Sequence, residues 1–165
     1  MRYNIIDDYA VLASNTDWKY TGDIVVPQKV TASDGKKCPV TALEEGCFRD
    51  CKTVTSVLLP SSITKIGEYC FCGCIHLQRV NIPSSVTSLG KSTFSGCSSL
   101  TEIHLPRHLT SLGYACFARC CSIKNIELPP YVEYLGKFCF SGCTSLESIT
   151  IPSSVTCIED QCFYG

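Results

Sequence analysis

The chain has 165 residues, of which 45% are hydrophobic and 18% are charged, and its formal net charge is −1 at pH 7. This composition is typical of a folded globular protein, and the near-neutral charge without a basic block argues against binding to nucleic acid or to an anionic membrane surface. No apolar run approaches about 20 residues, so direct membrane insertion is not expected. The N-terminal residues also lack the apolar core of a signal peptide, which leaves an intracellular location and a removed leader as alternatives.

Residues 1–23 are predicted to form a capping segment for a repeat array that begins at residue 24. Two short pieces, Tyr3–Ile6 and Tyr9–Leu12, flank a pair of aspartates and indicate a hairpin. The first unit of a stacked array would otherwise expose its apolar interior, so aromatic side chains are expected to pack there. The candidate capping aromatics are Tyr3, Tyr9, Trp18 and Tyr20.

The first repeat is predicted to contain an insertion. Its strand–proline step ends at Pro27, and Pro27 and Pro60 are 33 positions apart, whereas the later prolines are 23 apart. The ten additional residues surround Asp34-Gly35, a dipeptide that favours a type I′ hairpin turn. A hairpin insertion is therefore predicted near residues 28–41.

From Phe48 onward, a unit of 23 residues recurs in a common register of phenylalanine, cysteine, apolar, proline and glycine columns. Such fixed periods are the signature of repeat architectures. The phenylalanine column consists of Phe48, Phe71, Phe94, Phe117, Phe140 and Phe163. The glycine column consists of Gly67, Gly90, Gly113 and Gly136.

Two alternating apolar residues before each proline predict a short strand, because a period of two places both on one face. The predicted strands are 57–59, 80–82, 103–105, 126–128 and 149–151. A second extended piece follows each proline, and the glycine column is expected to permit a turn of unusual backbone geometry. A compact or single helical turn then leads to the next phenylalanine. Each unit can bury its apolar side chains only against its neighbours, so the predicted architecture is a solenoid.

The unit L-x-x-I-x-L-P-x-x-L-x-x-L-G-x-x-x-F-x-x-C, residues 100–120, resembles the repeats of BspA-like leucine-rich repeat proteins. The resemblance covers residues 24–165 and implies about six coils. It implies an α/β-type leucine-rich repeat solenoid that is right-handed and strand-rich, with short helical or 3-10 turns. It also implies a parallel sheet on the concave face, which is the usual binding surface of a solenoid.

The stretch CFCGC, residues 70–74, holds three of the fourteen cysteines. Cys70 and Cys74 belong to columns of the repeat, so both are predicted to be buried free thiols that pack as small apolar groups. Cys72 is off-column and is expected nearer the surface. Two alternatives to free thiols remain. One is disulfide bonding, with Cys72, Cys121 or Cys157 as the favoured partners. The other is metal binding by the repeated Cys-x-x-x-Cys pairs.

The sequence contains no phosphate-cradling glycine loop or nucleophile elbow, and His104 with His108 offers only a weak surface metal site. No enzymatic activity, cofactor or metal is therefore expected. The outward positions of the predicted strands form a polar surface of mixed charge, which suits a protein or glycan partner better than a nucleic acid or a lipid. These candidate binding residues are Ser56, Leu58, Arg79, Asn81, Glu102, His104, Asn125, Glu127, Ser148 and Thr150. A solvated sheet without a partner is the alternative interpretation.

The resemblance implies a non-enzymatic adhesion or recognition module of a cell-surface or secreted protein, with a host or neighbouring-cell protein, or a glycan, as its partner. Two alternatives stay open: a spacer or assembly domain of a larger multidomain protein, and a cysteine-based redox or metal-binding protein. The repeats stop at residues 162–165 without a capping segment. A longer array, or an end-to-end contact of the last coil with another chain, is therefore expected.

Overall fold

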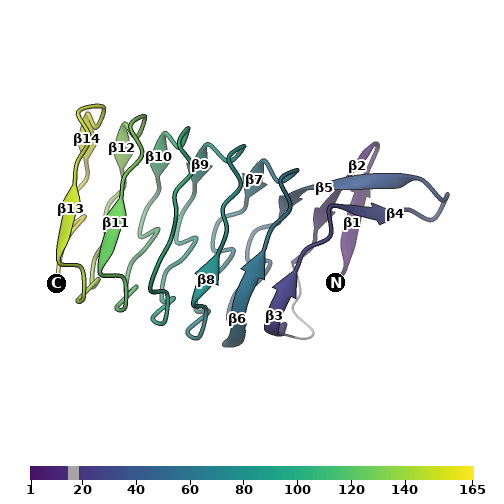
Figure 1. The fold of residues 1–165 in the computed structure, drawn as a ribbon, viewed down its shortest axis with the longest axis horizontal. Helices are drawn as coiled ribbons and strands as arrows, with labels where there is room; N and C mark the ends of the chain where they lie inside the picture. The colour runs from purple at the N-terminus through teal and green to yellow at the C-terminus, as the bar shows by residue number, and fades with distance from the viewer. Residues whose placement is uncertain (15–18) are drawn as a thin grey trace.

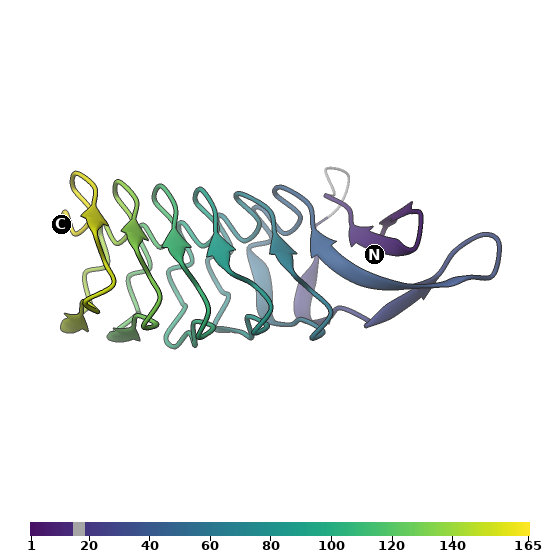
Figure 2. The same cartoon turned by 90° about the horizontal axis from the view of Figure 1, so that it is seen from above.

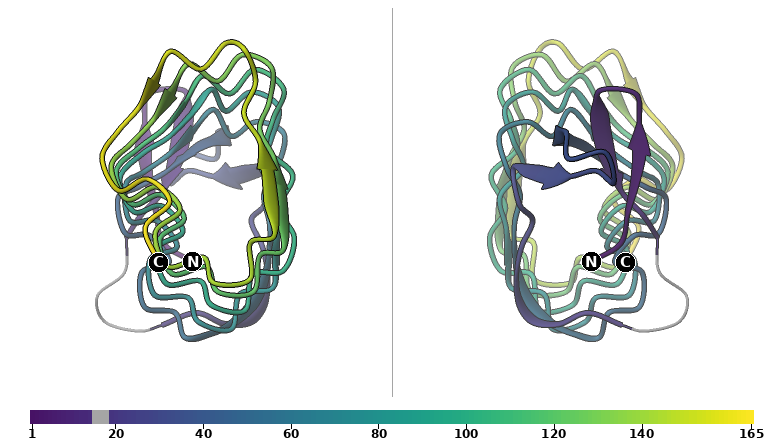
Figure 3. Two further views of the ribbon diagram at one scale, coloured as in Figure 1. Left: turned by 90° about the vertical axis from the view of Figure 1, so that its left-hand side faces the viewer. Right: turned by 90° about the vertical axis from the view of Figure 1, so that its right-hand side faces the viewer.

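The computed structural model describes residues 1–14 and 19–165, so the predicted capping role of Trp18 lies outside the described residues. The coils lie side by side along the long axis, from β3 (Thr21–Val25) at one end to β14 (Cys157–Ile158) at the other (Figure 1). Seen from the C-terminal end, the chain runs counterclockwise as it advances toward the viewer (Figure 3). The solenoid is therefore right-handed, as the resemblance implied.

The first strand of each coil contributes to one side of the solenoid, in two separate parallel groups. The first group consists of β3, β6 (Thr53–Leu58) and β8 (Arg79–Val80). The second consists of β11 (Asn125–Glu127) and β13 (Ser148–Thr150). The strand predicted at 103–105 is not formed, so the expected continuous sheet is interrupted at that coil. We call this side of the molecule, including residues 101–105, the strand face.

The second extended piece of each coil builds another parallel sheet, which we call the second sheet. It consists of β9 (Ser88–Leu89), β10 (Ser111–Leu112), β12 (Tyr134–Leu135) and β14, in the order β14-β12-β10-β9. The equivalent strand β7 (Lys65–Ile66) pairs instead with β5 (Lys37–Leu43), nearer the N-terminus. In each of these two-residue strands the second residue is buried and the first is more exposed. The exception is β14 in the last coil, where the second residue, Ile158, is also exposed.

Two hairpins occupy the N-terminal end. β1 (Tyr3–Ile6) pairs antiparallel with β2 (Tyr9–Leu12), and β4 (Lys29–Thr31) pairs antiparallel with β5. The β4–β5 hairpin, drawn in blue, projects beyond the stack (Figure 2). β2 pairs in parallel with β5, which joins the first hairpin to the array.

The predicted capping aromatics behave differently from one another. Tyr20 is buried and its ring lies 5.0 Å from that of Phe48, so it covers the end of the phenylalanine column. Tyr3 is partly buried and packs against the core. The prediction is wrong for Tyr9, which is 38% exposed because it stands on the outer side of the β1–β2 hairpin.

The phenylalanine column forms the centre of the core, as predicted. Phe71, Phe94 and Phe117 are 0% exposed and Phe140 is 3% exposed. From Phe48 to Phe163, successive rings are nearly parallel, with interplanar angles of 3–7° and centroids 5.1–5.6 Å apart. Stacking at this separation adds to the free energy of burial, so each coil is stabilised by both of its neighbours.

The expected short helical turns are not present among the described residues, and no helix there could span a membrane. The residues two before and two after each phenylalanine have a left-handed backbone, as Ser92 (φ 51°) and Gly96 (φ 76°) show around Phe94. Alternating handedness prevents a helix from continuing. The turn groups bond to the next coil instead: the Phe94 N–H donates to the carbonyl oxygen of Cys116 at 2.8 Å.

The glycine column has a different role from the expected one. None of Gly67, Gly90, Gly113 and Gly136 has a positive φ, so the column does not supply an unusual turn. A Cβ on Gly136 would lie 2.5 Å from the carbonyl carbon of Gly113, and one on Gly113 would lie 2.8 Å from that of Gly90. At Gly67, Gly113 and Gly136, glycine is required because the backbone of the neighbouring coil approaches too closely for any side chain.

Candidate binding face

All ten predicted binding residues lie on the strand face, and all except the half-buried Ser56 are exposed. Leu58 is the one large apolar side chain among them, and it lines a shallow hollow of about 240 Å³ between β6 and β8, together with Ser56, Arg79 and Asn81. Thr150 lies at the far end of the face, on β13. The ten side chains therefore share one surface of the coils, and their role in binding stays a prediction.

Some of these polar groups are already used within the solenoid. The Ser56 hydroxyl donates to Asp23 Oδ1 at 2.5 Å, and this bond, with a second from Thr55, lowers the pKa of the Asp23 carboxyl. The Asn81 side chain accepts from the Leu59 N–H at 2.6 Å and donates to the Leu59 carbonyl at 2.9 Å. Asn81 thus completes the backbone pairing beyond β8, and it is a structural residue before it is a binding residue.

The interruption of the strand face lies at Thr101–Leu105. Among the described residues, no backbone hydrogen bond joins the N–H or C=O groups of this segment to either neighbouring coil. The coils on both sides do pair with their other neighbours, through β6–β8 and β11–β13. Backbone groups of an exposed segment must then be satisfied by water or by a bound molecule.

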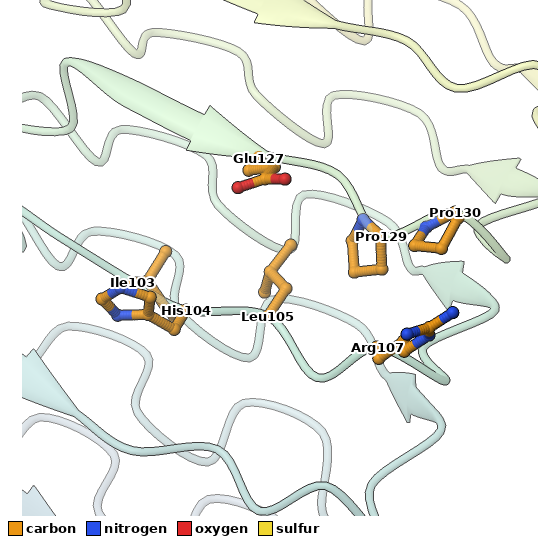
Figure 4. A pocket seen from close by; sticks show the side chains of 7 residues that line it. All are labelled: Ile103, His104, Leu105, Arg107, Glu127, Pro129 and Pro130. Atoms are coloured by element: carbon orange, nitrogen blue, oxygen red, sulfur yellow. The ribbon is translucent and has the colours of Figure 1, made fainter.

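Three hollows meet at this segment, and His104 lines all of them. Two hollows lie toward β11. The first, of about 310 Å³, is lined by Leu105, Arg107 and Glu127. The second, of about 480 Å³, is lined by Glu102, Lys124 and Glu127. Toward β8, a third of about 310 Å³ is lined by Arg79 and Glu102. Figure 4 shows the first hollow, with Ile103, His104, Leu105 and Arg107 on one coil and Glu127, Pro129 and Pro130 on the next.

The walls of these hollows combine apolar and charged groups. Ile103 is buried, Leu105 is half-buried, and Pro129 closes one side. His104 Nε2 lies 3.3 Å from Glu102 Oε1, and both side chains are largely exposed. An exposed pair of this kind is weak and easily broken, so both side chains are free to turn toward a partner.

Two residues that directly follow Arg107 and Pro130, which line the first hollow, were missed in the sequence. Three coils carry Ser-Ser after the strand proline, at Pro60, Pro83 and Pro152. The second serine donates a hydrogen bond to the coil before it, as Ser85 does to the Ile63 carbonyl at 2.5 Å. Two consecutive coils have His108 and Tyr131 at that position instead. Their rings stack with centroids 5.6 Å apart, and Tyr131 is 48% exposed. The break in the serine column was the signal that could have revealed them.

The cysteines lie away from this face, most of them in the interior or the turns, and the exposed Cys157 lies on β14. Cys70 and Cys74 are fully buried and Cys72 is half-buried, which confirms the predicted burial of CFCGC. The column of Cys74 does more than pack, because from Cys74 onward each thiol donates to the phenylalanine carbonyl of the coil before it. These bonds join Cys74 to Phe48 (3.0 Å), Cys97 to Phe71 (3.1 Å), Cys120 to Phe94 (3.2 Å) and Cys143 to Phe117 (3.1 Å).

Burial also makes these thiols weak acids. It raises the pKa of Cys116 to about 12 and raises the pKa values of Cys70, Cys74 and Cys97 well above the usual range. Cys162 differs, because a hydrogen bond from Cys139 lowers its pKa. Among residues 1–14 and 19–165, no group of three or more His, Cys, Asp or Glu side chains is arranged to hold a metal ion.

The repeat unit matches the model of the BspA type leucine-rich repeat region, in six copies over residues 39–165. The chain belongs to this BspA-type family. No curated protein sequence matches it at a significant level.

Solved structures of other leucine-rich repeat proteins share the fold of this BspA-type chain. A leucine-rich repeat protein from Bacteroides ovatus is 33% identical with a TM-score of 0.87, and the match covers 93% of this chain and 40% of that one. A leucine-rich cell surface protein from Faecalibacterium prausnitzii is 31% identical with a TM-score of 0.88, over 99% of this chain and 44% of that one. The Treponema pallidum leucine-rich repeat protein is 29% identical with a TM-score of 0.80, over 92% and 68%. This BspA-type chain thus spans less than half the length of the first two proteins.

Proposed function

We propose that the chain is a non-enzymatic recognition module of a cell-surface protein, and that it binds a macromolecular partner across the strand face, centred on His104. The observation that carries this proposal is the interrupted coil: Thr101–Leu105 has unpaired backbone groups, and three hollows open beside it. The similarity to a protein described as a leucine-rich cell surface protein supports the location.

The composition of the face suits recognition. Interfaces combine an apolar centre with a polar rim, and a few residues in central pockets carry most of the binding free energy. Here Ile103 and Leu105 supply the apolar centre, and Glu102, His104 and Glu127 stand around it. His104 and Glu127 line two hollows in common, so they are the residues whose truncation should weaken binding most.

The test is a binding screen of the purified chain against an immobilised panel of extracellular proteins and glycoproteins. A double variant, His104→Ala with Glu127→Ala, should weaken saturable binding to a panel member by about 30-fold or more, the effect expected for a binding hot spot. The matched control is Lys65→Ala with Glu133→Ala, which also removes one basic and one acidic exposed side chain, but away from the strand face, on β7 and directly before β12. Equal affinity of the double variant and the control, or no saturable binding to any panel member, would refute the proposal.

A further inference from the structure

We propose that the hollows around His104 form a site for a neutral oligosaccharide, an inference that rests on the proposed recognition function and specifies the chemistry of the partner. Their volumes, about 310, 480 and 310 Å³, are of the size that holds small ligands, roughly 300–1,000 Å³. Because His104 lines all three, one chain of sugar units could pass from one hollow to the next across this coil.

The charges around the hollows favour a ligand without net charge. Each hollow has both signs in its lining: Arg107 with Glu127, Lys124 with Glu102 and Glu127, and Arg79 with Glu102. A polyanion would be attracted by the basic member of each set and repelled by the acidic one. Sugar hydroxyl groups both donate and accept hydrogen bonds, so they can satisfy a carboxylate and a guanidinium or ammonium group at the same site.

The unpaired backbone of Thr101–Leu105 points to the same chemistry. In a coil stack, the N–H and C=O groups of an extended segment point sideways, toward the neighbouring coils. Those neighbours occupy both sides, so another peptide strand cannot be added there, whereas a hydroxyl group is small enough to enter beside the backbone as water does. An oligosaccharide could therefore make these bonds where a protein partner would leave them to solvent.

The apolar part of the site suits the carbon–hydrogen faces of sugar rings. Leu105 and Pro129 form an apolar wall in the first hollow, and Pro130 at its edge is followed by the exposed ring of Tyr131. That ring is held by stacking on His108, so little conformational entropy is lost when a ligand packs on it. These two rings occur only in the two coils that border the first hollow, where the serine column is broken.

The test uses neutral hexasaccharides of glucose, mannose, galactose and xylose on an array, followed by calorimetry, with hexagalacturonate as the charged probe of equal length. At least one neutral hexasaccharide should bind, and hexagalacturonate should bind more weakly. Glu127→Ala and Tyr131→Ala should each lower the affinity for that sugar about tenfold or more, while Glu133→Ala should not change it. Thermal melting of each variant establishes that it is folded. The inference is overturned by absence of neutral-sugar binding at millimolar concentration, by tighter binding of hexagalacturonate, or by unchanged affinity in both Glu127→Ala and Tyr131→Ala.

A glycoprotein arm separates this inference from the proposed function. A mucin whose sialic acids have been removed, so that its glycans are largely neutral, is tested before and after chemical removal of those glycans. Loss of binding after deglycosylation, together with loss in the His104→Ala, Glu127→Ala variant, supports a glycan partner. Binding that survives deglycosylation but is lost in that variant would overturn the glycan inference and leave the recognition module standing. Binding that is the same in the double variant and the Lys65→Ala, Glu133→Ala control would count against both.

Discussion

Replacement of Phe94 by alanine tests the stacked core most sharply. Phe94 is fully buried between two parallel rings, with centroids 5.1 Å from Phe71 and 5.3 Å from Phe117. Truncation removes the ring from the core and leaves a cavity, and changes of this kind cost about 3–5 kcal/mol of unfolding free energy. The loss also reaches further than one coil, because Phe71 and Phe117 each lose one stacking partner.

The measurement is thermal unfolding followed by circular dichroism, together with urea titration. A loss of this size should lower the melting temperature by roughly 6–20 °C for a chain of this length. Phe163→Ala is the matched control, because Phe163 is 42% exposed and stacks on Phe140 alone, and it should cost clearly less. The reasoning would be refuted if the Phe94→Ala protein melted within about one degree of wild type. It would also be refuted if the Phe94→Ala protein were as stable as the Phe163→Ala protein.

Three further predictions follow from the core and the turns. Gly113→Ala should lower the unfolding free energy by about 1–3 kcal/mol, because its Cβ would lie 2.8 Å from the Gly90 carbonyl carbon; an unchanged urea midpoint would contradict the close approach of the coils. Thiol counting without reductant should find few reactive cysteines in the native protein, led by the exposed Cys157, and nearly all fourteen after unfolding; a deficit in the unfolded chain would mean disulfides. Stability should be constant between pH 7 and about pH 8 and fall above about pH 9, since the unfolded thiols lose protons near their ordinary pKa of about 8.5 while the buried thiol of Cys116, with its pKa raised to about 12, keeps its proton. Urea midpoints measured from pH 7 to pH 10 check this, and a midpoint that rises with pH would contradict it.

Much of the fold was predictable because the same pattern of apolar, proline and phenylalanine residues recurs in every repeat. The phenylalanine column, the alternating apolar pairs and the terminating prolines recur every 23 residues, so the stacking of coils and the side that each residue faces could both be inferred. The burial of Cys70 and Cys74 followed from the same register. That register also placed the ten candidate binding residues on the strand face.

Other features depend on contacts between coils and are not visible in one unit. The segment T-E-I-H-L, residues 101–105, has the same apolar alternation as K-N-I-E-L, residues 124–128, yet only the second forms a strand. The glycine column looked like a turn requirement, because a sequence does not show how closely two backbones approach. The turns lack the expected helical form because alternate N–H groups, such as those of Ser92, Phe94 and Gly96, bond to the following coil.

The candidate site was predicted only in outline. Alternation in the strands identified Glu102, His104 and Glu127 as exposed, but it gave all coils equal weight. The concentration of hollows at one coil coincides with missing backbone pairing between coils, and both are tertiary features. His108 and Tyr131 could have been noticed as departures from the serine column, since a break in a regular repeat marks a position under a different constraint.

Amide hydrogen exchange at residues 101–105 tests most directly whether this coil is the recognition site. In the free protein these amides should exchange much faster than those of β6, which lies between β3 and β8 in a paired ladder. Addition of the partner found in the binding screen should slow exchange at 101–105 more than anywhere on the second sheet. Exchange in the free protein as slow as that of β6, or protection on binding that falls on the second sheet and leaves 101–105 unchanged, would contradict the account.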